Sequence, residues 1–244
     1  MEMRGRIIVA LDVDSLSNVN PFFVKEVAPY VGCFKLGLDL LTSAGAPHGV
    51  EYIHSLGGQV FYDGDFNSTP NKIAGATRTI AGLKVNMFSV HASAGVEAMK
   101  AAVANRGFSL VLAVTVLTSL EESSANLIFG SPKDETILRF ANYARAAGCD
   151  GIICTPQELE LLNMQKELDK LLKIVSNVRP SWIAVDGQSR TMIPSEAIKA
   201  GATALIIDYH ALTANLPAEI GTPIDATKKI REEISSALKE MKAM

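Results

Sequence analysis

The sequence of 244 residues has little that suits a secreted, membrane-spanning or nucleic-acid-binding protein. Its three cysteines, Cys33, Cys149 and Cys154, are odd in number and lie in apolar surroundings, as buried thiols in a reducing compartment do. No apolar run reaches the roughly 18 residues of a membrane span, and the start of the chain lacks the apolar core of a signal peptide. With 23 basic and 26 acidic residues and no basic cluster, the balance of charge argues against nucleic-acid binding. We therefore expect a cytoplasmic protein.

Only 20% of the residues are charged and 48% are apolar, so the chain can bury a large core and intrinsic disorder is excluded. Barrels of alternating strands and helices often reach this length as one domain. No linker interrupts the sequence, and we expect a single domain over residues 1–244.

Eight short runs rich in β-branched residues recur along the chain, and most are apolar throughout, as parallel strands buried on both faces are. Amphipathic stretches lie between them, among them Ala94–Asn105, Asp134–Ala147 and Asp225–Met244. Eight such units favour an α/β fold of the closed (β/α)₈ TIM-barrel type, and no Gly-x-Gly-x-x-Gly turn supports a dinucleotide-binding sheet. The predicted strands are Ile7–Val13, Cys33–Leu38, Gln59–Asp63, Met87–His91, Leu110–Thr115, Gly151–Thr155, Lys173–Ser176 and Ala204–Asp208.

Polar residues follow these strands, at the end of a TIM barrel where active sites form. Three acids, a lysine and two histidines are expected to converge at one mouth. The strand-end residues are Asp12, Lys35, Asp63, Asp65, His91, Thr115 to Ser119, Cys154 to Pro156, Ser176 to Arg179, and Asp208 to His210.

Seven short motifs along nearly the whole chain are similar to those of one enzyme family. They are Val-Ala-Leu-Asp (9–12), Phe-Lys-Leu-Gly (34–37), Val-His-Ala-Ser (90–93), Ala-Val-Thr-Val-Leu-Thr-Ser (113–119), Gly-Ile-Ile-Cys-Thr-Pro-Gln-Glu (151–158), Asp-Gly-Gln-Ser-Arg (186–190) and Pro-Ser-Glu-Ala-Ile (194–198). The chain thereby resembles orotidine 5′-phosphate decarboxylase. The resemblance implies a homodimeric barrel without cofactor or metal, which converts orotidine monophosphate to uridine monophosphate near the dimer interface.

The catalytic signature of that family, Asp-x-Lys-x-x-Asp followed by Ile-Pro-x-Thr, is altered here. Asp63, Pro70 and Asn71 match it and set the register, but Asp65 stands in place of the proton-donating lysine. Ser68 takes the place of the second aspartate, and Lys72 that of a threonine that contacts the pyrimidine. An aspartate adds negative charge beside an anionic substrate, so decarboxylation is expected to be lost or strongly impaired.

The phosphate site implied by the resemblance is altered too. Asp208 and Tyr209 stand where a Gly-Arg pair is expected, and Val178 replaces a glycine after the seventh strand. Gln188 is the one expected phosphate contact that remains. The loop that carries Ile183 and Val185 is apolar where more polar residues are expected.

Because these changes gather at one mouth, we interpret the chain as a repurposed or designed barrel that acts on a less charged molecule. Our first hypothesis is an amine lyase of the retro-aldol type, in which Lys72 forms a Schiff base and Tyr209 or His210 moves a proton. The remaining expected substrate contacts are Asp12, Lys35, Asp63, Ser68, Ser119, Val178, Ile183, Val185, Gln188 and Asp208.

Other hypotheses remain open. Asp65 could act as a general base toward a carbon acid, with Trp182 or Tyr209 stacking on the substrate. The chain could be an authentic or impaired decarboxylase of pyrimidine synthesis, a natural relative with another role, or a barrel that only binds a small molecule. No ligand spacing for a metal is present, and no metal or cofactor is expected.

Overall fold

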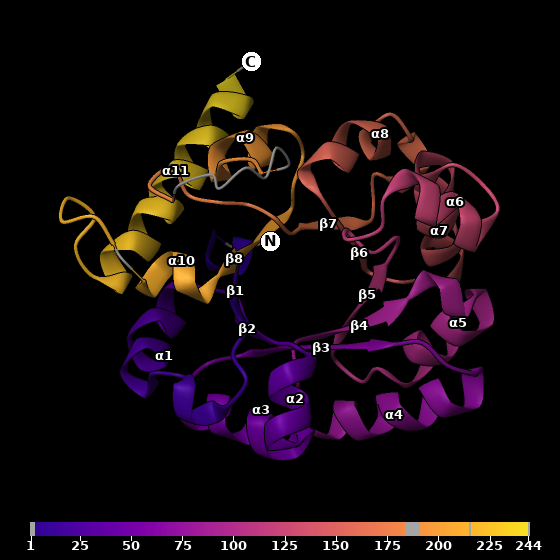
Figure 1. Cartoon of the computed structure of the whole chain (residues 1–244), viewed down its shortest axis with the longest axis horizontal. Helices are drawn as coiled ribbons and strands as arrows, with labels where there is room; N and C mark the ends of the chain where they lie inside the picture. Colours follow the sequence, from indigo (N-terminus) through magenta and orange to yellow (C-terminus); the bar gives the residue numbers. More distant parts are fainter. Residues whose placement is uncertain (1–2, 184–190, 215, 244) are drawn as a thin grey trace.

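The computed structural model describes residues 3–183, 191–214 and 216–243. Eight parallel strands pair in chain order and close into a barrel, with β1 hydrogen bonded to both β2 and β8 (Figure 1). The predicted (β/α)₈ barrel is therefore confirmed. The strands are β1 (Ile7–Leu11), β2 (Cys33–Leu36), β3 (Val60–Phe66), β4 (Met87–His91), β5 (Leu110–Val114), β6 (Gly151–Cys154), β7 (Leu172–Val175) and β8 (Ala204–Asp208).

The helices surround the strands as an outer ring (Figure 1). They are α1 (Pro21–Val27), α2 (Leu38–Ala44), α3 (Ala46–Ser55), α4 (Pro70–Gly82), α5 (Val96–Asn105), α6 (Glu122–Phe129), α7 (Lys133–Ala147), α8 (Leu159–Asn163), α9 (Pro194–Lys199), α10 (Tyr209–Thr213) and α11 (Pro223–Ala243). Short 3₁₀ turns lie at Met3–Arg6, Leu16–Asn18, Ala28–Tyr30, Ala92–Ala94, Pro156–Glu158 and Lys166–Leu168.

Two buried layers explain why the strand runs are apolar throughout. On β1, Ile7 and Val9 belong to the core between strands and helices, whereas Ile8 and Ala10 belong to a second cluster inside the barrel. Because successive side chains of a strand point to opposite faces, both layers need apolar residues. The barrel is thus a packed core whose functional groups lie at its rim.

Six of the eight strands end one to three residues from the predicted position. β1 ends at Leu11, two residues early, and β3 continues to Phe66 instead of ending at Asp63. The pairing of β3 with β4 shifts register between Tyr62 and Phe66, and Asp65 within this stretch has φ 46°. A non-glycine residue in the left-handed region is uncommon, and such residues often occur at functional sites.

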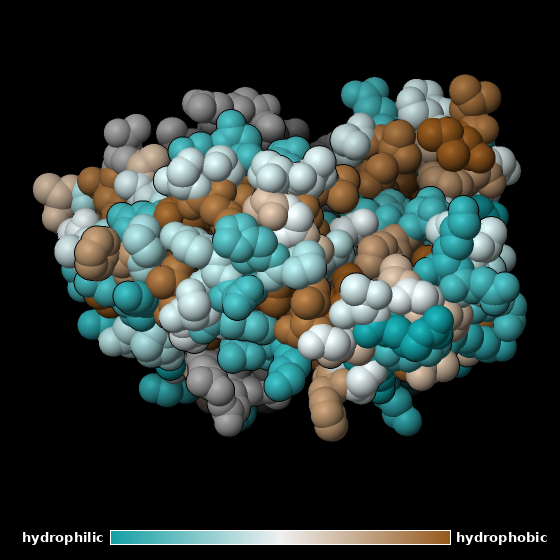
Figure 2. All heavy atoms as spheres, turned by 90° about the horizontal axis from the view of Figure 1, so that it is seen from below, coloured by the Kyte–Doolittle hydropathy of each residue, from teal (hydrophilic) through white to brown (hydrophobic). Residues whose placement is uncertain are grey.

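The three cysteines are free thiols and are buried. Burial raises the pKa of Cys33 and of Cys149 to about 12. One outer face of the molecule mixes hydrophilic and hydrophobic residues (Figure 2). Within the described ranges, no helix has the length and apolar character that crossing a membrane requires.

Candidate active site

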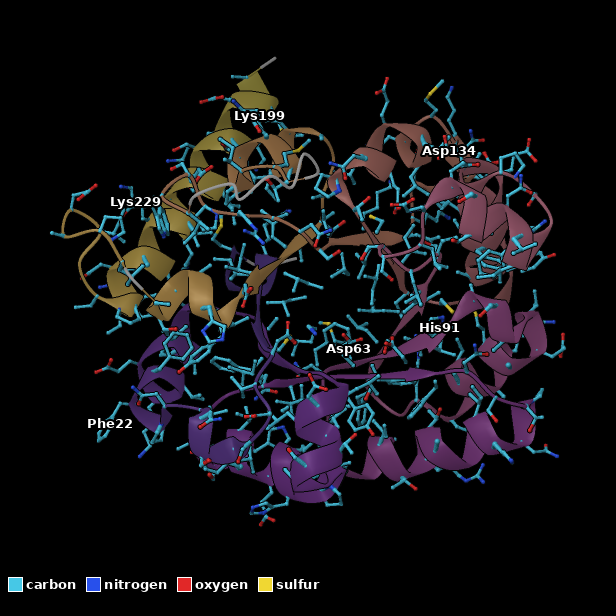
Figure 3. All side chains as sticks on the ribbon, in the orientation of Figure 1. Phe22, Asp63, His91, Asp134, Lys199 and Lys229 are labelled. Atoms are coloured by element: carbon cyan, nitrogen blue, oxygen red, sulfur yellow. The ribbon has the colours of Figure 1, made fainter. Side chains whose placement is uncertain are left out.

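A pocket of about 280 Å³ lies at the carboxyl ends of the strands. Its apolar wall comes from inward positions on four strands, Ala10, Val114, Ile153 and Ile206. Its polar side carries Asp12, Lys35, Asp63 and Asp65, from β1 to β3. Figure 3 shows Asp63 and His91 near the ring of strands, whereas Phe22, Lys199 and Lys229 lie on the outer helical layer. The acids and the lysine of the predicted convergence therefore line one pocket, whereas neither of the two predicted histidines, His91 and His210, lines it.

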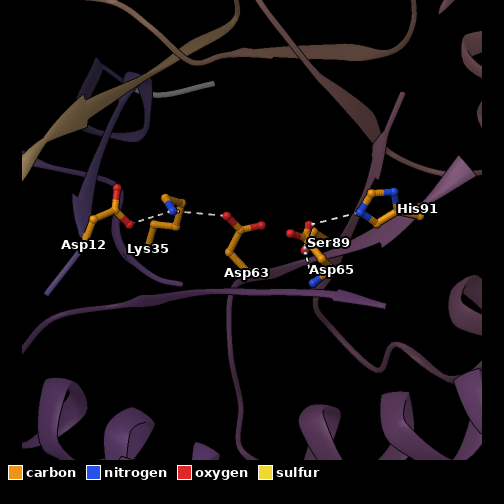
Figure 4. A network of polar contacts seen from close by, with 6 residues as sticks. All are labelled: Asp12, Lys35, Asp63, Asp65, Ser89 and His91. Atoms are coloured by element: carbon orange, nitrogen blue, oxygen red, sulfur yellow. Dashed lines mark hydrogen bonds and ion pairs between the residues drawn. The ribbon is translucent and has the colours of Figure 1, made fainter. Parts of the chain in front are cut away.

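Lys35 lies between two carboxylates in this pocket (Figure 4). Its Nζ is 3.0 Å from Asp12 Oδ1 and 3.2 Å from Asp63 Oδ2, and only 13% of its side chain is exposed. Burial alone would lower the pKa of Lys35, but the charges of Asp63 and Asp12 outweigh burial and raise this pKa above its ordinary value. Lys35 is thus a fixed ammonium rather than a nucleophile.

The second carboxylate oxygen of Asp63 is not satisfied by the protein. Asp63 Oδ1 is buried and has no hydrogen-bond partner among the described residues. A buried acceptor of this kind is costly to leave unpaired. A ligand that carries a hydroxyl or N–H group at this point would remove that cost.

Asp65 pairs with neither Lys35 nor Lys72 in the part of the chain that the structure describes. Its backbone N–H donates to Ser89 Oγ at 3.0 Å, and the Ser89 hydroxyl donates to Asp65 Oδ1 at 3.3 Å. His91 Nε2 lies 3.7 Å from the same Oδ1 (Figure 4). Burial and the repulsion of Asp63 raise the pKa of Asp65, against smaller opposite effects of His91, Ser89 and Lys35.

The loop after β7 forms another part of the pocket with Asn177, Val178 and Arg179. Asn177 has φ 56°, whereas Val178 is 2% exposed. In this loop Asn177 takes the left-handed conformation that glycine favours. Arg179 brings a second cation to the pocket, a role that the sequence analysis did not assign to it.

Comparisons with known proteins assign the sequence and the fold to one family. A family profile described as "Orotidine 5′-phosphate decarboxylase / HUMPS family" matches residues 5–207. The chain belongs to this family. An orotidine 5′-phosphate decarboxylase of Geobacter sp. (strain M21) is 37% identical over 238 residues, which cover 94% of this chain and 95% of the relative. That of Heliobacterium modesticaldum is 36% identical over 249 residues and covers 98% and 99%.

A solved structure gives the same assignment. The crystal structure of orotidine 5′-phosphate decarboxylase from Lactobacillus acidophilus aligns with a TM-score of 0.77 at 26% identity and covers 94% of this chain and 99% of that one. The chain is therefore a member of a lyase family, as the resemblance implied. Our main hypothesis of a repurposed or designed retro-aldol lyase is wrong, because the similarity to decarboxylases extends over the whole chain. Nothing in these matches supports an engineered origin.

In this decarboxylase-family barrel, Lys72 does not line the pocket. It lies in the first turn of α4 and is exposed. The buried side of α4 is formed by Ile73, Thr77 and Ile80, at helical spacing. Lys72 directly precedes Ile73 and therefore does not lie on that buried side. The Schiff-base role predicted for Lys72 lacks the desolvated amine that it requires.

Tyr209 and His210 are also outside the pocket. Tyr209 is 7% exposed and packs edge-on against Phe23, with ring centroids 5.0 Å apart, and its hydroxyl accepts a 3.4 Å hydrogen bond from the backbone of Asn20. His210 is exposed. Neither side chain is placed to shuttle a proton, and Tyr209 cannot stack on a ligand in this pocket. Asp208 does line the pocket, and it caps α10 by accepting from the His210 N–H at 3.2 Å.

The other residues predicted to contact the substrate either lie away from the pocket or fall outside the described residues. Ser68 and Ser119 are exposed and do not line the pocket. Ile183 packs against the helical core, and the Trp182 indole donates to the carbonyl of Ala211 at 3.3 Å, so neither reaches a ligand there. Val185 and Gln188 lie outside the described residues. Among the residues that are described, no group of three or more His, Cys, Asp or Glu is arranged to hold a metal ion.

Ser89 was missed, although the sequence contained a signal for it. Ser89 and His91 are two residues apart on one strand and therefore point to the same side. Ser89 is also the only hydroxyl in the apolar run Met87–His91. A hydroxyl two residues before a histidine at the end of a strand indicates a hydrogen-bond partner for a polar group at the barrel mouth.

Proposed function

We propose that this chain decarboxylates orotidine 5′-phosphate in pyrimidine synthesis, with a turnover well below that of relatives that carry a lysine at position 65. The observation that supports the reaction is the 37% identity to a decarboxylase over nearly the whole chain. The pocket agrees with it, because Lys35 and Asp63 remain paired at the mouth.

The charges of the pocket support the low turnover. Four aspartates line it, whereas Lys35 and Arg179 are its two cations among the described residues. The substrate carries a phosphate and a carboxylate, and both are repelled by this excess of negative charge. We assign Arg179 to the phosphate, because a guanidinium can bind phosphate oxygens with two hydrogen bonds.

The test measures loss of orotidine 5′-phosphate with the purified protein and with Asp65→Lys. Wild-type turnover should exceed the uncatalysed rate, and Asp65→Lys should raise it about 10²-fold, because an ammonium at this position attracts the anionic substrate that a carboxylate repels. Lys72→Met is the matched control and should leave the rate unchanged, since Lys72 is exposed outside the pocket.

Absence of turnover by both the wild type and Asp65→Lys would overturn the proposed reaction, even if both bound the substrate. A wild-type rate equal to that of the lysine-bearing relatives would instead refute the impairment alone. These two outcomes separate the chain's reaction from its efficiency.

We further propose a homodimer in the cytoplasm, as the resemblance suggests. The three buried free thiols support a reducing compartment. Sedimentation at micromolar concentration should give twice the chain mass of 26.1 kDa. A single 26.1 kDa species would contradict the dimer.

A further inference from the structure

Asp65 is held in the pocket by an unusual piece of backbone. It lies near the end of β3, where the pairing with β4 shifts register, and its φ is 46°. Such a conformation is unfavourable for a non-glycine residue and persists only where other contacts impose it. The hydrogen bond from the Asp65 N–H to Ser89 is one such contact. The result is a carboxyl group that lines the pocket beside Asp63.

The contacts of Asp65 involve one of its two oxygens. Ser89 donates to Oδ1 at 3.3 Å and His91 Nε2 lies 3.7 Å from it, whereas Oδ2 has no partner among the residues that the structure describes. His91 is itself well enclosed, with 13% of its side chain exposed. One oxygen is thus oriented by β4, and the other is available to a bound molecule.

The surroundings favour the protonated form of Asp65. Burial is the largest cause of its raised pKa and the charge of Asp63 is the next. A substrate carboxylate in the same pocket would add a further negative charge and raise this pKa more. The charged and titratable groups that face Asp65 are Asp63 on β3, Lys35 on β2 and His91 on β4, with Asp12, Arg179 and Asp208 lining the same pocket.

Decarboxylation replaces carbon dioxide by a proton, so some group of the pocket must supply that proton. We propose that Asp65 is the proton donor in this chain and that His91 is the positioning residue that returns the proton to it. This inference rests on the proposed function.

The bond between the ring carbon and the carboxylate breaks, and its electron pair remains on the ring carbon. The O–H bond of Asp65 then breaks and its proton joins that carbon. Carbon dioxide leaves, and the Asp65 carboxylate takes a proton from the imidazolium of His91, which is reprotonated by water. One proton from solvent is consumed in each cycle, and no oxidant or metal is needed.

The first test is the pH dependence of kcat/KM for orotidine 5′-phosphate between pH 5 and 9. Since the acid form of Asp65 is the active one, the rate should rise as the pH falls through its ionisation. Asp65→Asn should lose about 10²-fold and this pH dependence together. His91→Asn should lower kcat with little change in KM. Asp39→Asn, an exposed acid on α2, is the matched control and should behave as the wild type.

The second test does not depend on turnover. Calorimetric binding of orotidine 5′-phosphate at pH 7 in two buffers of different ionisation enthalpy should show more proton uptake by the wild type than by Asp65→Asn. Equal rates, equal pH profiles or equal proton uptake in the two proteins would overturn the inference and leave the decarboxylase assignment intact. Absence of both binding and turnover would remove the proposed function, and the inference with it.

Discussion

Replacing Lys35 by methionine should destabilise the barrel at its mouth, because this ammonium neutralises two carboxylates. The contact with Asp12 adds little, since half of that carboxylate is exposed and exposed pairs contribute about 0.2–1 kcal/mol. The contact with Asp63 matters more, because only 18% of Asp63 is exposed. Removing one partner of a buried pair costs about 3–5 kcal/mol. We expect a loss of about 3 kcal/mol, at the low end of that range, since Asp63 retains some contact with water.

The assay is urea unfolding at pH 7.5 of Lys35→Met, Asp63→Asn and the double variant. The raised pKa of Lys35 means that its contribution is complete below its unfolded value of about 10.4 and is lost only as the pH rises through the folded value. At pH 7.5 the whole effect is therefore measured. The double variant should be more stable than the sum of the two losses predicts.

Lys72→Met is the control for the loss of a lysine, and it should change stability by less than about 0.5 kcal/mol, because Lys72 is exposed. A loss below about 1 kcal/mol for Lys35→Met, or strict additivity with Asp63→Asn, would refute the reasoning.

Two smaller predictions concern Tyr209 and Asn177. Tyr209→Phe should lower the free energy of unfolding by less than about 1 kcal/mol, because the 3.4 Å hydrogen bond of the Tyr209 hydroxyl is long. It should leave turnover unchanged, because the ring lies outside the pocket. Tyr209→Ala should lower the free energy of unfolding by about 3–5 kcal/mol, because it leaves a cavity beside Phe23. Thermal unfolding and the decarboxylation assay measure both, and a tenfold fall in kcat for Tyr209→Phe would contradict the assignment. Asn177→Gly should be at least as stable as the wild type and Asn177→Ala about 1 kcal/mol less stable, because φ at this position is 56°. Urea midpoints decide the order, and an alanine variant as stable as the glycine variant would disprove it.

The fold could be predicted from the sequence because its signals are local. Most strands are short runs of apolar residues. In a run such as Ile7–Leu11 every residue is apolar, because both faces of the strand are buried. The meeting of Lys35 and Asp63 was also predictable, because both were expected at the carboxyl ends of neighbouring strands.

The orientation of the other site residues depends on contacts that are distant in sequence. Tyr209 is turned into the core by Phe23, which precedes it by 186 positions, and no local pattern around Tyr209 indicates this contact. Lys72 was expected at the mouth because the motif residues Asp63 and Pro70 fix its position in the chain but not the rotation of α4. The partner of Asp65 was unpredictable for a related reason, because the bulge at the end of β3 turns it toward β4.

The buried cysteines also allow the opening of the barrel to be measured by alkylation of their thiols. At pH 8 a thiol with a pKa of about 12 is ionised on the order of one time in 10⁴, and the thiolate is the form that reacts with an alkylating reagent. Alkylation of the native protein must then await exposure of Cys33, which lies inside the barrel on β2, or of Cys154 on β6. Mass spectrometry can follow the two sites separately. Equal labelling rates would mean that the two sides of the barrel open as one cooperative unit, and unequal rates would identify the side that opens first.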